Sequence, residues 1–347
     1  MSDQLNSLLD RLLEARGPSG YEGEPRQVWH SEAEEFADEV FTDVHGSTYA
    51  AVGPEDGPEI MLAGHIDEIG LMVHHIDDNG YLRVKSVGGW DPQVLVSQRV
   101  TVLAEERAID GVVGRPPIHM IDREQRKKAA EITDMYIDIG AEDGEEARGL
   151  VERGDVAVVR SSPMDMLNDR VAGRALDNRM GAAVVLETLR RVQERQLDCR
   201  VVAVATVQEE IGLKGADASA FRLDPDGAIA VDVTFSTDHP GVNPNEHGDF
   251  EMGEGPVLAR GPVVNPALLD RLTRAAKARD IEYQVRGEAG NSHTDADSIY
   301  TNRSGIATGV VSVPNRYMHT PSQTVSRQDV ESAVQLISGF LEDLPED

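Results

Sequence analysis

The sequence predicts an α/β protein in which a mixed sheet is flanked by helices and interrupted by a small inserted β-barrel. Helical and strand-like segments alternate near both ends of the chain, as expected for a sheet covered by helices. The middle of the chain instead contains short strands of alternating polarity, separated by turn sequences. We therefore assign residues 1–72 and 161–347 to the α/β domain and residues 73–160 to the inserted barrel.

The first α/β segment begins with two amphipathic helices. The first helix is predicted from leucines at helical spacing: Leu5, Leu8, Leu9, Leu12 and Leu13. The second helix follows a turn-rich loop and has an apolar face formed by Val28, Trp29, Ala33 and Phe36. A strand is expected at residues 39–44, and a buried strand over residues 59–67 ends its apolar run at His65.

The inserted barrel is predicted from five strand-like runs with turn sequences between them. These runs cover residues 77–84, 99–106, 108–114, 135–141 and 154–160. A short polar stretch at residues 122–131 is helix-like, and a loop is expected at residues 140–149.

The second α/β segment returns to alternating helices and strands. Helices are predicted at residues 179–195, 266–280 and 328–344, with a helix start at 295–301. Strands are predicted at residues 199–210, 227–234, 281–285 and 306–314. Because helices separate most of these strands, the sheet is expected to be mostly parallel.

The composition excludes several classes of partner. A net charge of −29 argues against nucleic acid and anionic membranes, because binding phosphate requires clustered Lys and Arg. No run reaches the roughly 18 apolar residues of a membrane span, and the N-terminus does not resemble a signal peptide, so we expect a cytoplasmic protein. The acidic, lysine-poor composition resembles that of proteins from salt-loving organisms, so a halophilic source is expected.

The single cysteine limits the kind of metal site that the chain can build. Cys199 has no second cysteine with which to form an internal disulfide or a thiolate zinc cage. Any metal ligands must therefore be His, Asp and Glu side chains.

Acidic and histidine residues follow several of the predicted apolar strands. Ligands of open α/β sheets bind beyond the carboxyl ends of the strands, and charged groups beside a packed core indicate a functional site. The candidate metal ligands at these positions are His65, Asp177, Glu210, Asp232 and His319.

These oxygen and nitrogen donors suit Zn²⁺, Co²⁺ or Mn²⁺. Three carboxylates and one hydroxide balance the charge of two divalent ions, whereas one ion leaves the carboxylates in excess. Asp67 is predicted to fix the ring of His65 from outside the ligand set. If the backbone is extended there, Glu209 points away from Glu210 and is predicted to remain unligated and act as a general base.

Each candidate also has a plain structural interpretation. An isolated histidine is more often hydrogen-bonded or exposed than a ligand, and Asp177 and Asp232 would suit a helix cap and a strand end. The combination of these residues, rather than any single one, indicates a metal site.

Five motifs, in this order and at these separations, resemble the co-catalytic dinuclear-metal aminopeptidases of the tetrahedral TET type. That family is also labelled glutamyl aminopeptidase or endoglucanase. The motifs are GHIDEIG at 64–70, ALDNRMG at 175–181, VQEEIGLKGA at 207–216, VDVT at 231–234 and MHTPSQ at 318–323. PSGYE at 18–22 and GRPPIHM at 114–120 are similar to the same family, so the resemblance covers nearly the whole chain.

The resemblance implies a role for each candidate residue. Asp177 would bridge two metal ions, with His65 and Asp232 completing one site and Glu210 and His319 completing the other. Glu209 would be the base that activates a bridging water, and Asp67 would be the partner of His65.

The resemblance also implies an architecture and partners. The fold would be zinc-peptidase-like, and the barrel would be a PDZ-like dimerisation domain. Peptides with a free N-terminus would be the substrates, and dimers would assemble into a hollow tetrahedral dodecamer.

Two positions depart from the family pattern. Residues 291–297, NSHTDAD, stand where the family has a glycine-rich GGTDA, so Asp295 matches and His293 does not. Gln323 stands where an acid is common. Neither residue is expected to contact the proposed ligands.

The predicted function is the metal-dependent removal of N-terminal residues from peptides. The alternatives are an N-acyl amino-acid deacylase or dipeptidase on the same scaffold, a glycoside hydrolase, and a non-enzymatic metal-binding shell. The β-rich insert favours the peptidase over the deacylase. Two tryptophans are few for a cleft that stacks sugars.

Overall fold

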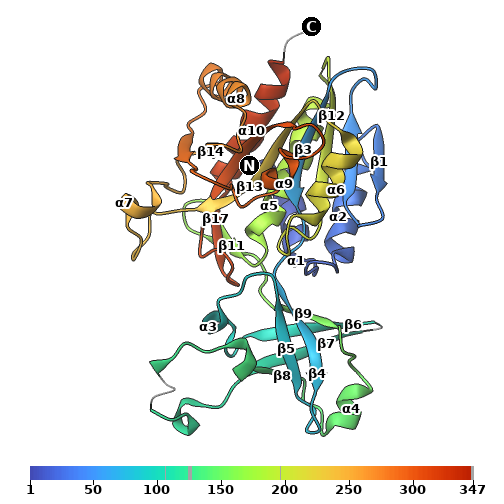
Figure 1. Ribbon diagram of the computed structural model, residues 1–347, viewed down its shortest axis with the longest axis vertical. Helices are drawn as coiled ribbons and strands as arrows, with labels where there is room; N and C mark the ends of the chain where they lie inside the picture. The colour runs from blue at the N-terminus through green and yellow to red at the C-terminus, as the bar shows by residue number, and fades with distance from the viewer. Residues whose placement is uncertain (106, 124–126, 196, 345–347) are drawn as a thin grey trace.

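The computed structural model describes residues 1–105, 107–123, 127–195 and 197–344. Figure 1 shows an α/β body with a separate barrel beneath it. The predicted fold class, a mixed sheet flanked by helices with an inserted β-barrel, is confirmed.

The central sheet contains eleven strands among the described residues. Its main path runs in the order β1 (Glu39–Thr42), β2 (Thr48–Val52), β12 (Arg200–Thr206), β3 (Glu59–His65), β13 (Gly227–Phe235), β16 (Ala307–Arg316), β17 (Gln323–Ser326), β11 (Arg170–Gly173) and β10 (Met164–Met166). Off this path, β14 (Val257–Arg260) pairs with β16, and β15 (Gln284–Gly287) pairs with β14. The centre of the sheet, from β12 through β3 and β13 to β16, is parallel, so the carboxyl ends of these strands share one edge.

Helices cover both faces of this sheet (Figure 1). One face packs against α1 (Asp3–Glu14), α2 (Gly23–Ala33), α5 (Leu176–Val192), α8 (Pro266–Ala278) and α10 (Arg327–Glu342). The opposite face packs against α6 (Lys214–Leu223) and α9 (Ala296–Ile299). All the predicted leucines of α1 are buried, because their helical spacing places them on the side that faces the sheet. Among the described residues, no helix is both long and apolar enough to cross a membrane.

The second part of the fold is a closed antiparallel barrel. Its strands follow the order β4 (Gly70–Ile76), β5 (Leu82–Val87), β8 (Tyr136–Asp138), β7 (Arg107–Gly114), β6 (Arg99–Ala104) and β9 (Val156–Val159). Alternate side chains such as Leu71, Val73, Val100 and Val102 point inward and form a core of its own. The domain boundaries proposed from the sequence stay a prediction.

Several predicted elements differ in the structure. The strand expected over 199–210 ends at Thr206, so Glu209 and Glu210 lie in a turn and the expectation of an extended backbone there is wrong. The loop expected at 140–149 contains α4 (Gly144–Arg148), because the Asp143 side chain accepts hydrogen bonds from the N–H groups of its first turn.

The helix-like stretch at 122–131 falls partly outside the described residues, since residues 124–126 are not described. Its described residues form no α-helix. The strand expected at 281–285 is displaced to β15, and strands β2, β4, β10, β11, β14 and β17 were not predicted. Two short helices were also not predicted: α3 (Pro92–Leu95) lies between β5 and β6, and α7 (Pro244–His247) lies between β13 and β14.

Candidate active site

The predicted site residues meet at the carboxyl edge of the parallel strands. His65 ends β3, and Thr206 is its register partner at the end of β12, directly before the turn that carries the glutamate pair. The Nε2 atom of His65 lies 3.2 Å from Asp177 Oδ1, 3.8 Å from Glu209 Oε2 and 3.8 Å from Asp232 Oδ1. This edge is where open α/β sheets bind their ligands.

Asp177 lies between two imidazoles. Its Oδ1 atom faces His65, and its Oδ2 atom lies 3.4 Å from the Nε2 atom of His319. His319 also approaches Glu210, with 3.6 Å between Nε2 and Oε2. The two oxygens of the Asp177 carboxylate therefore face two separate groups of possible metal ligands.

The backbone at the start of α5 presents the Asp177 carboxylate to the site. Asp177 and Asn178 do not have helical dihedral angles, although they lie at the start of the helix. The Asn178 amide donates to the carbonyl oxygen of Val231 at 2.7 Å and accepts from the Gly181 N–H at 3.0 Å, which fixes this turn against β13.

Gln323 supports Asp177 directly, so the expectation that this position does not contact the proposed ligands is wrong. The backbone N–H of Asp177 donates to Gln323 Oε1 at 2.7 Å. Gln323 is 2% exposed and lies at the start of β17, a strand that the sequence did not reveal. Its amide oxygen supplies the acceptor that an acid at this position would supply.

Asp67 is buried behind the site and makes more contacts than the sequence suggested. Its Oδ1 atom lies 3.4 Å from His65 Nδ1, as expected for a partner of that ring. Its two oxygens also accept the backbone N–H groups of Glu209 at 3.1 Å and Glu210 at 3.2 Å, and Oδ2 accepts the Ser19 hydroxyl at 2.6 Å. Burial would raise the pKa of Asp67, but these hydrogen bonds and the His65 charge lower it.

The site concentrates negative charge in a buried place. Burial, together with the nearby charges of Asp232 and Asp295, raises the pKa of Glu209 to about 10 against the opposing effect of His65. Burial and the Asp177 charge raise the pKa of Glu210 to about 8. Burial is also the main cause that raises the pKa of Asp232 well above its usual range. Ionised carboxylates that crowd in this way require cations beside them.

The pKa values of the two histidines are raised as well, which favours the charged form of an imidazole. Burial would lower the pKa of His65, but the surrounding carboxylates raise it well above its ordinary value. The hydrogen bond with Asp177 is the main cause that raises the pKa of His319 to about 9. The same two imidazoles hold the pKa of Asp177 below its usual range despite burial.

The donor set fits divalent metal ions. Two groups each place one ligand atom per residue within 4.8 Å of the others: His65 with Asp177 and Glu210, and His65 with Glu209 and Asp232. All of these donors are carboxylate oxygens or imidazole nitrogens, the ligands preferred by zinc and its neighbours. These groupings differ from the pairing implied by the family resemblance, in which Glu210 is grouped with His319 and Glu209 stays outside.

Sequence reasoning missed two contributors. Asp295 is 2% exposed and accepts a hydrogen bond from the Thr206 hydroxyl, and its Oδ1 atom has no hydrogen-bond partner among the described residues. The match of residues 294–296 to the family motif marked Asp295 without giving it a role. The carbonyl of Gly89, in the loop after β5, pairs with His319 Nδ1, and only the Gly88-Gly89 pair in the sequence indicated such a close approach.

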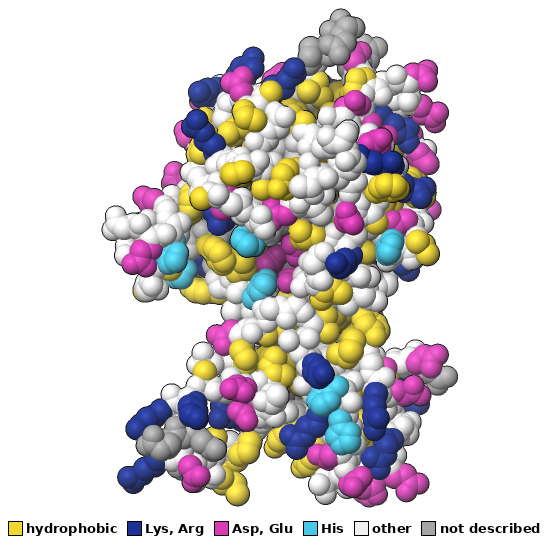
Figure 2. Space-filling model, viewed as in Figure 1, with side chains coloured by type: hydrophobic (Ala, Val, Ile, Leu, Met, Phe, Trp, Pro, Cys, Tyr) yellow, Lys and Arg dark blue, Asp and Glu magenta, His cyan; other side chains and the backbone are white. Residues whose placement is uncertain are grey.

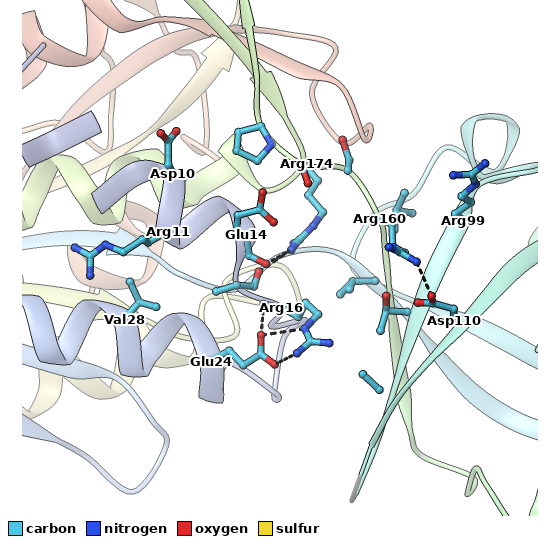
Figure 3. A pocket seen from close by; sticks show the side chains of 18 of the residues that line it. Asp10, Arg11, Glu14, Arg16, Glu24, Val28, Arg99, Asp110, Arg160 and Arg174 are labelled. Atoms are coloured by element: carbon cyan, nitrogen blue, oxygen red, sulfur yellow. Dashed lines mark hydrogen bonds and ion pairs between the residues drawn. The ribbon is translucent and has the colours of Figure 1, made fainter. Parts of the chain in front are cut away.

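A large cleft lies away from these residues (Figure 3). It measures about 1130 Å³ and lies between α1, α2 and the barrel strands β6, β7 and β9. Its walls include Arg16 paired with Glu24 and Arg160 paired with Asp110. None of the predicted site residues lines it. In the face shown in Figure 2, acidic side chains lie in a hollow of the α/β body above the barrel, with histidines beside them.

The sequence profile of the family described as M42 glutamyl aminopeptidase matches residues 46–336. The chain belongs to this family. The M42 chain is 36% identical to the lysyl aminopeptidase of Pyrococcus furiosus over 97% of its own length and 96% of that relative. As a member of this family it is a peptide hydrolase, specifically an aminopeptidase.

Solved structures show the same relationship. The M42 chain superposes on the TET aminopeptidase of Thaumarchaeota archaeon SCGC AB-539-E09 with a TM-score of 0.94 and 37% identity, covering 99% of this chain and 97% of that one. The TET1 peptidase of Pyrococcus horikoshii gives a TM-score of 0.87 and 32% identity over 98% and 100% of the two chains, and is described as assembling into a tetrahedron or a large octahedral shell. A structure described as a dodecamer of PhTET1 also gives 0.87 and 32%, over 99% and 100%.

Proposed function

We propose that this M42 aminopeptidase removes N-terminal residues from peptides at the cluster around Asp177. The observation that carries the proposal is the position of the Asp177 carboxylate, with one oxygen toward His65 and the other toward His319. A carboxylate with this placement is suited to serve two metal ions at once.

The residues that would hold the ions follow from this geometry. Asp177 would be shared, His65 and Asp232 would complete one site, and Glu210 and His319 would complete the other. Two divalent ions, zinc or cobalt, when bound would polarise the scissile carbonyl and lower the pKa of the attacking water.

Glu209 would act as the general base. Its Oε2 atom lies 3.8 Å from His65 Nε2, so the carboxylate reaches the centre of the cluster. It would accept a proton from the attacking water and deliver it to the nitrogen of the departing amine. Asp67 would hold both the His65 ring and the backbone of the glutamate turn in place.

Turnover of aminoacyl-4-nitroanilides, with and without a chelator, tests this function. We expect cleavage that the chelator abolishes and that Co²⁺ or Zn²⁺ restores, with two ions per chain at saturation. Activity that survives chelation, or saturation at one ion, would count against the two-ion site. Metal binding without any turnover would instead favour the non-enzymatic shell.

Acetylated substrates separate the peptidase from the deacylase alternative. An aminopeptidase requires the free α-amine, so blocking this amine with an acetyl group is expected to remove turnover. Equal cleavage of the blocked and free peptides would favour the deacylase. The two imidazoles beside Asp177 also argue against a glycoside hydrolase, which uses a pair of carboxylates.

We also propose that the protein assembles from dimers into a dodecamer, with the barrel as the dimerisation domain. The support is the assembly described for the TET1 structures at 32% identity and near-complete coverage. Because a chain of charge −29 repels its copies, we expect the assembly to need molar salt and to dissociate on dilution into low salt. A monomer in light scattering at molar salt would contradict this proposal.

A further inference from the structure

We infer that Glu22 is a positioning residue that holds the turn carrying Glu209 and Glu210 through a backbone hydrogen bond. This inference rests on the proposed function, in which Glu209 is the base. Glu22 lies 186 positions before Gln208 in the sequence, yet its Oε1 atom accepts the Gln208 N–H at 3.2 Å.

The turn after β12 is held at three successive backbone N–H groups. Glu22 accepts the first, from Gln208, and Asp67 accepts the next two, from Glu209 and Glu210. Asp67 is already assigned to this site through His65, whereas nothing in the proposed mechanism uses Glu22. Glu22 therefore completes a row of carboxylate acceptors along the turn.

Gln208 has a backbone conformation that requires support from outside the turn. Its φ of 57° lies in the left-handed region, which is unfavourable for a non-glycine residue. Such a conformation persists only where surrounding contacts hold it. The Glu22 carboxylate supplies that contact immediately before the proposed base.

Glu22 is itself held firmly. Its side chain also accepts the Gly20 N–H at 2.7 Å, and the residue is 7% exposed. The segment before it is hydrogen-bonded to the loop that follows β3: the Gly17 N–H donates to Glu68 Oε1 at 3.1 Å, and the Ser19 hydroxyl donates to Asp67 at 2.6 Å. Glu22 thus links the turn to a rigid part of the site.

The bond needs an acceptor oxygen and does not need a charge. Burial, together with the Asp67 charge, raises the pKa of Glu22 to about 7, so the pocket does not favour the ionised form. A glutamine at this position retains the acceptor oxygen and loses only the charge. A methionine keeps a similar length and volume and lacks the oxygen.

This difference defines the variants. Glu22→Met is expected to lower kcat by about 10- to 100-fold, because small displacements of a catalytic group have effects of this size. KM should stay within about threefold and both metal ions should remain bound, since Glu22 is in neither donor group. Glu22→Gln should have a kcat at least about tenfold higher than that of Glu22→Met. Glu35→Met, at an exposed glutamate of the same region, is the matched control and should match the wild type.

Hydrogen exchange of the Gln208 amide gives a readout that does not depend on activity. We expect slow exchange at Gln208 in the wild type and in Glu22→Gln, and faster exchange in Glu22→Met. A Glu22→Met enzyme with nearly wild-type kcat would overturn the inference, as would equal impairment of the Met and Gln variants or unchanged exchange. A wild-type protein that cleaves no aminoacyl substrate would refute the proposed function, while the exchange comparison would still decide the role of Glu22.

Discussion

The Nδ1 atom of His319 lies 2.7 Å from the carbonyl oxygen of Gly89. Gly89 follows the second strand of the barrel, whereas His319 belongs to the α/β body beyond β16. The inserted part of the chain therefore helps to orient one imidazole of the active site. A hydrogen bond on one ring nitrogen fixes which nitrogen remains available for a metal ion.

Adding a methyl group at Gly89 tests this contact. A Cβ atom there would lie 3.2 Å from His319 Nδ1, close enough to displace the ring. We expect Gly89→Ala to weaken metal binding and turnover by about 3- to 10-fold. Gly290→Ala is the control, because a Cβ atom at Gly290 meets no atom within 4 Å. Equal metal titrations for the two variants would show that the contact does not matter.

Glu209 and Glu210 are neighbours with different proposed roles. Glu209→Gln keeps the shape but removes the proposed base, so kcat should fall by roughly 10²- to 10⁴-fold while both metals remain bound. Glu210→Gln should instead lose about one metal per chain and recover partly in excess metal. Kinetics and metal analysis of the two proteins check both outcomes. The assignment is wrong if Glu209→Gln loses metal while Glu210→Gln retains two ions.

The buried ion pairs of Glu68 are expected to matter for stability. Glu68 is 3% exposed and pairs with Arg174 and, at 2.8 Å, with the fully buried Arg179. Glu68→Gln leaves two buried guanidinium groups without their counter-charge, so the free energy of unfolding should fall by roughly 3–5 kcal/mol. Denaturant titration measures this change.

An exposed ion pair provides the control for Glu68. Glu24 pairs with Arg16 while both side chains remain more than a third accessible to solvent. Glu24→Gln should therefore change the free energy of unfolding by less than about 1 kcal/mol. Similar losses for the two variants would contradict the view that burial makes the Glu68 pairs important.

Asp329 is expected to make stability depend on pH. It accepts the N–H groups of Gly253 at 2.7 Å and Gly255 at 2.9 Å, and burial raises its pKa to about 6. Between roughly pH 4 and 6 the folded protein keeps a proton that the unfolded chain has released. The contribution of Asp329 to the free energy of unfolding is therefore complete below about pH 4 and is lost as the pH rises to 6.

Comparison with Asp329→Asn isolates this effect from the other acids. The wild type should lose on the order of 2 kcal/mol more than the variant between pH 4 and 6.5, as measured by denaturant unfolding at high salt. Parallel stability curves for the two proteins would rule out the contribution of Asp329.

The elements with strong local patterns were predicted well. The leucine spacing of α1 and the apolar run of β3 up to His65 are sufficient to place both elements, because each buries one continuous face. Strands β10 and β17 were missed, because they span three and four residues and form through pairing with β11. Such short strands have too few residues to show a periodic pattern.

The same contrast holds for the site. The residue types and their positions were enough to select the candidate side chains, since His65, Asp177 and Glu210 are chemically unusual where apolar segments end. The contact of Gln323 with Asp177 and that of Glu22 with the turn before Glu209 are visible only in the folded protein. These contacts join residues far apart in the chain through backbone N–H groups that every residue except proline carries. No side-chain pattern marks them, and only the folded backbone brings donor and acceptor together.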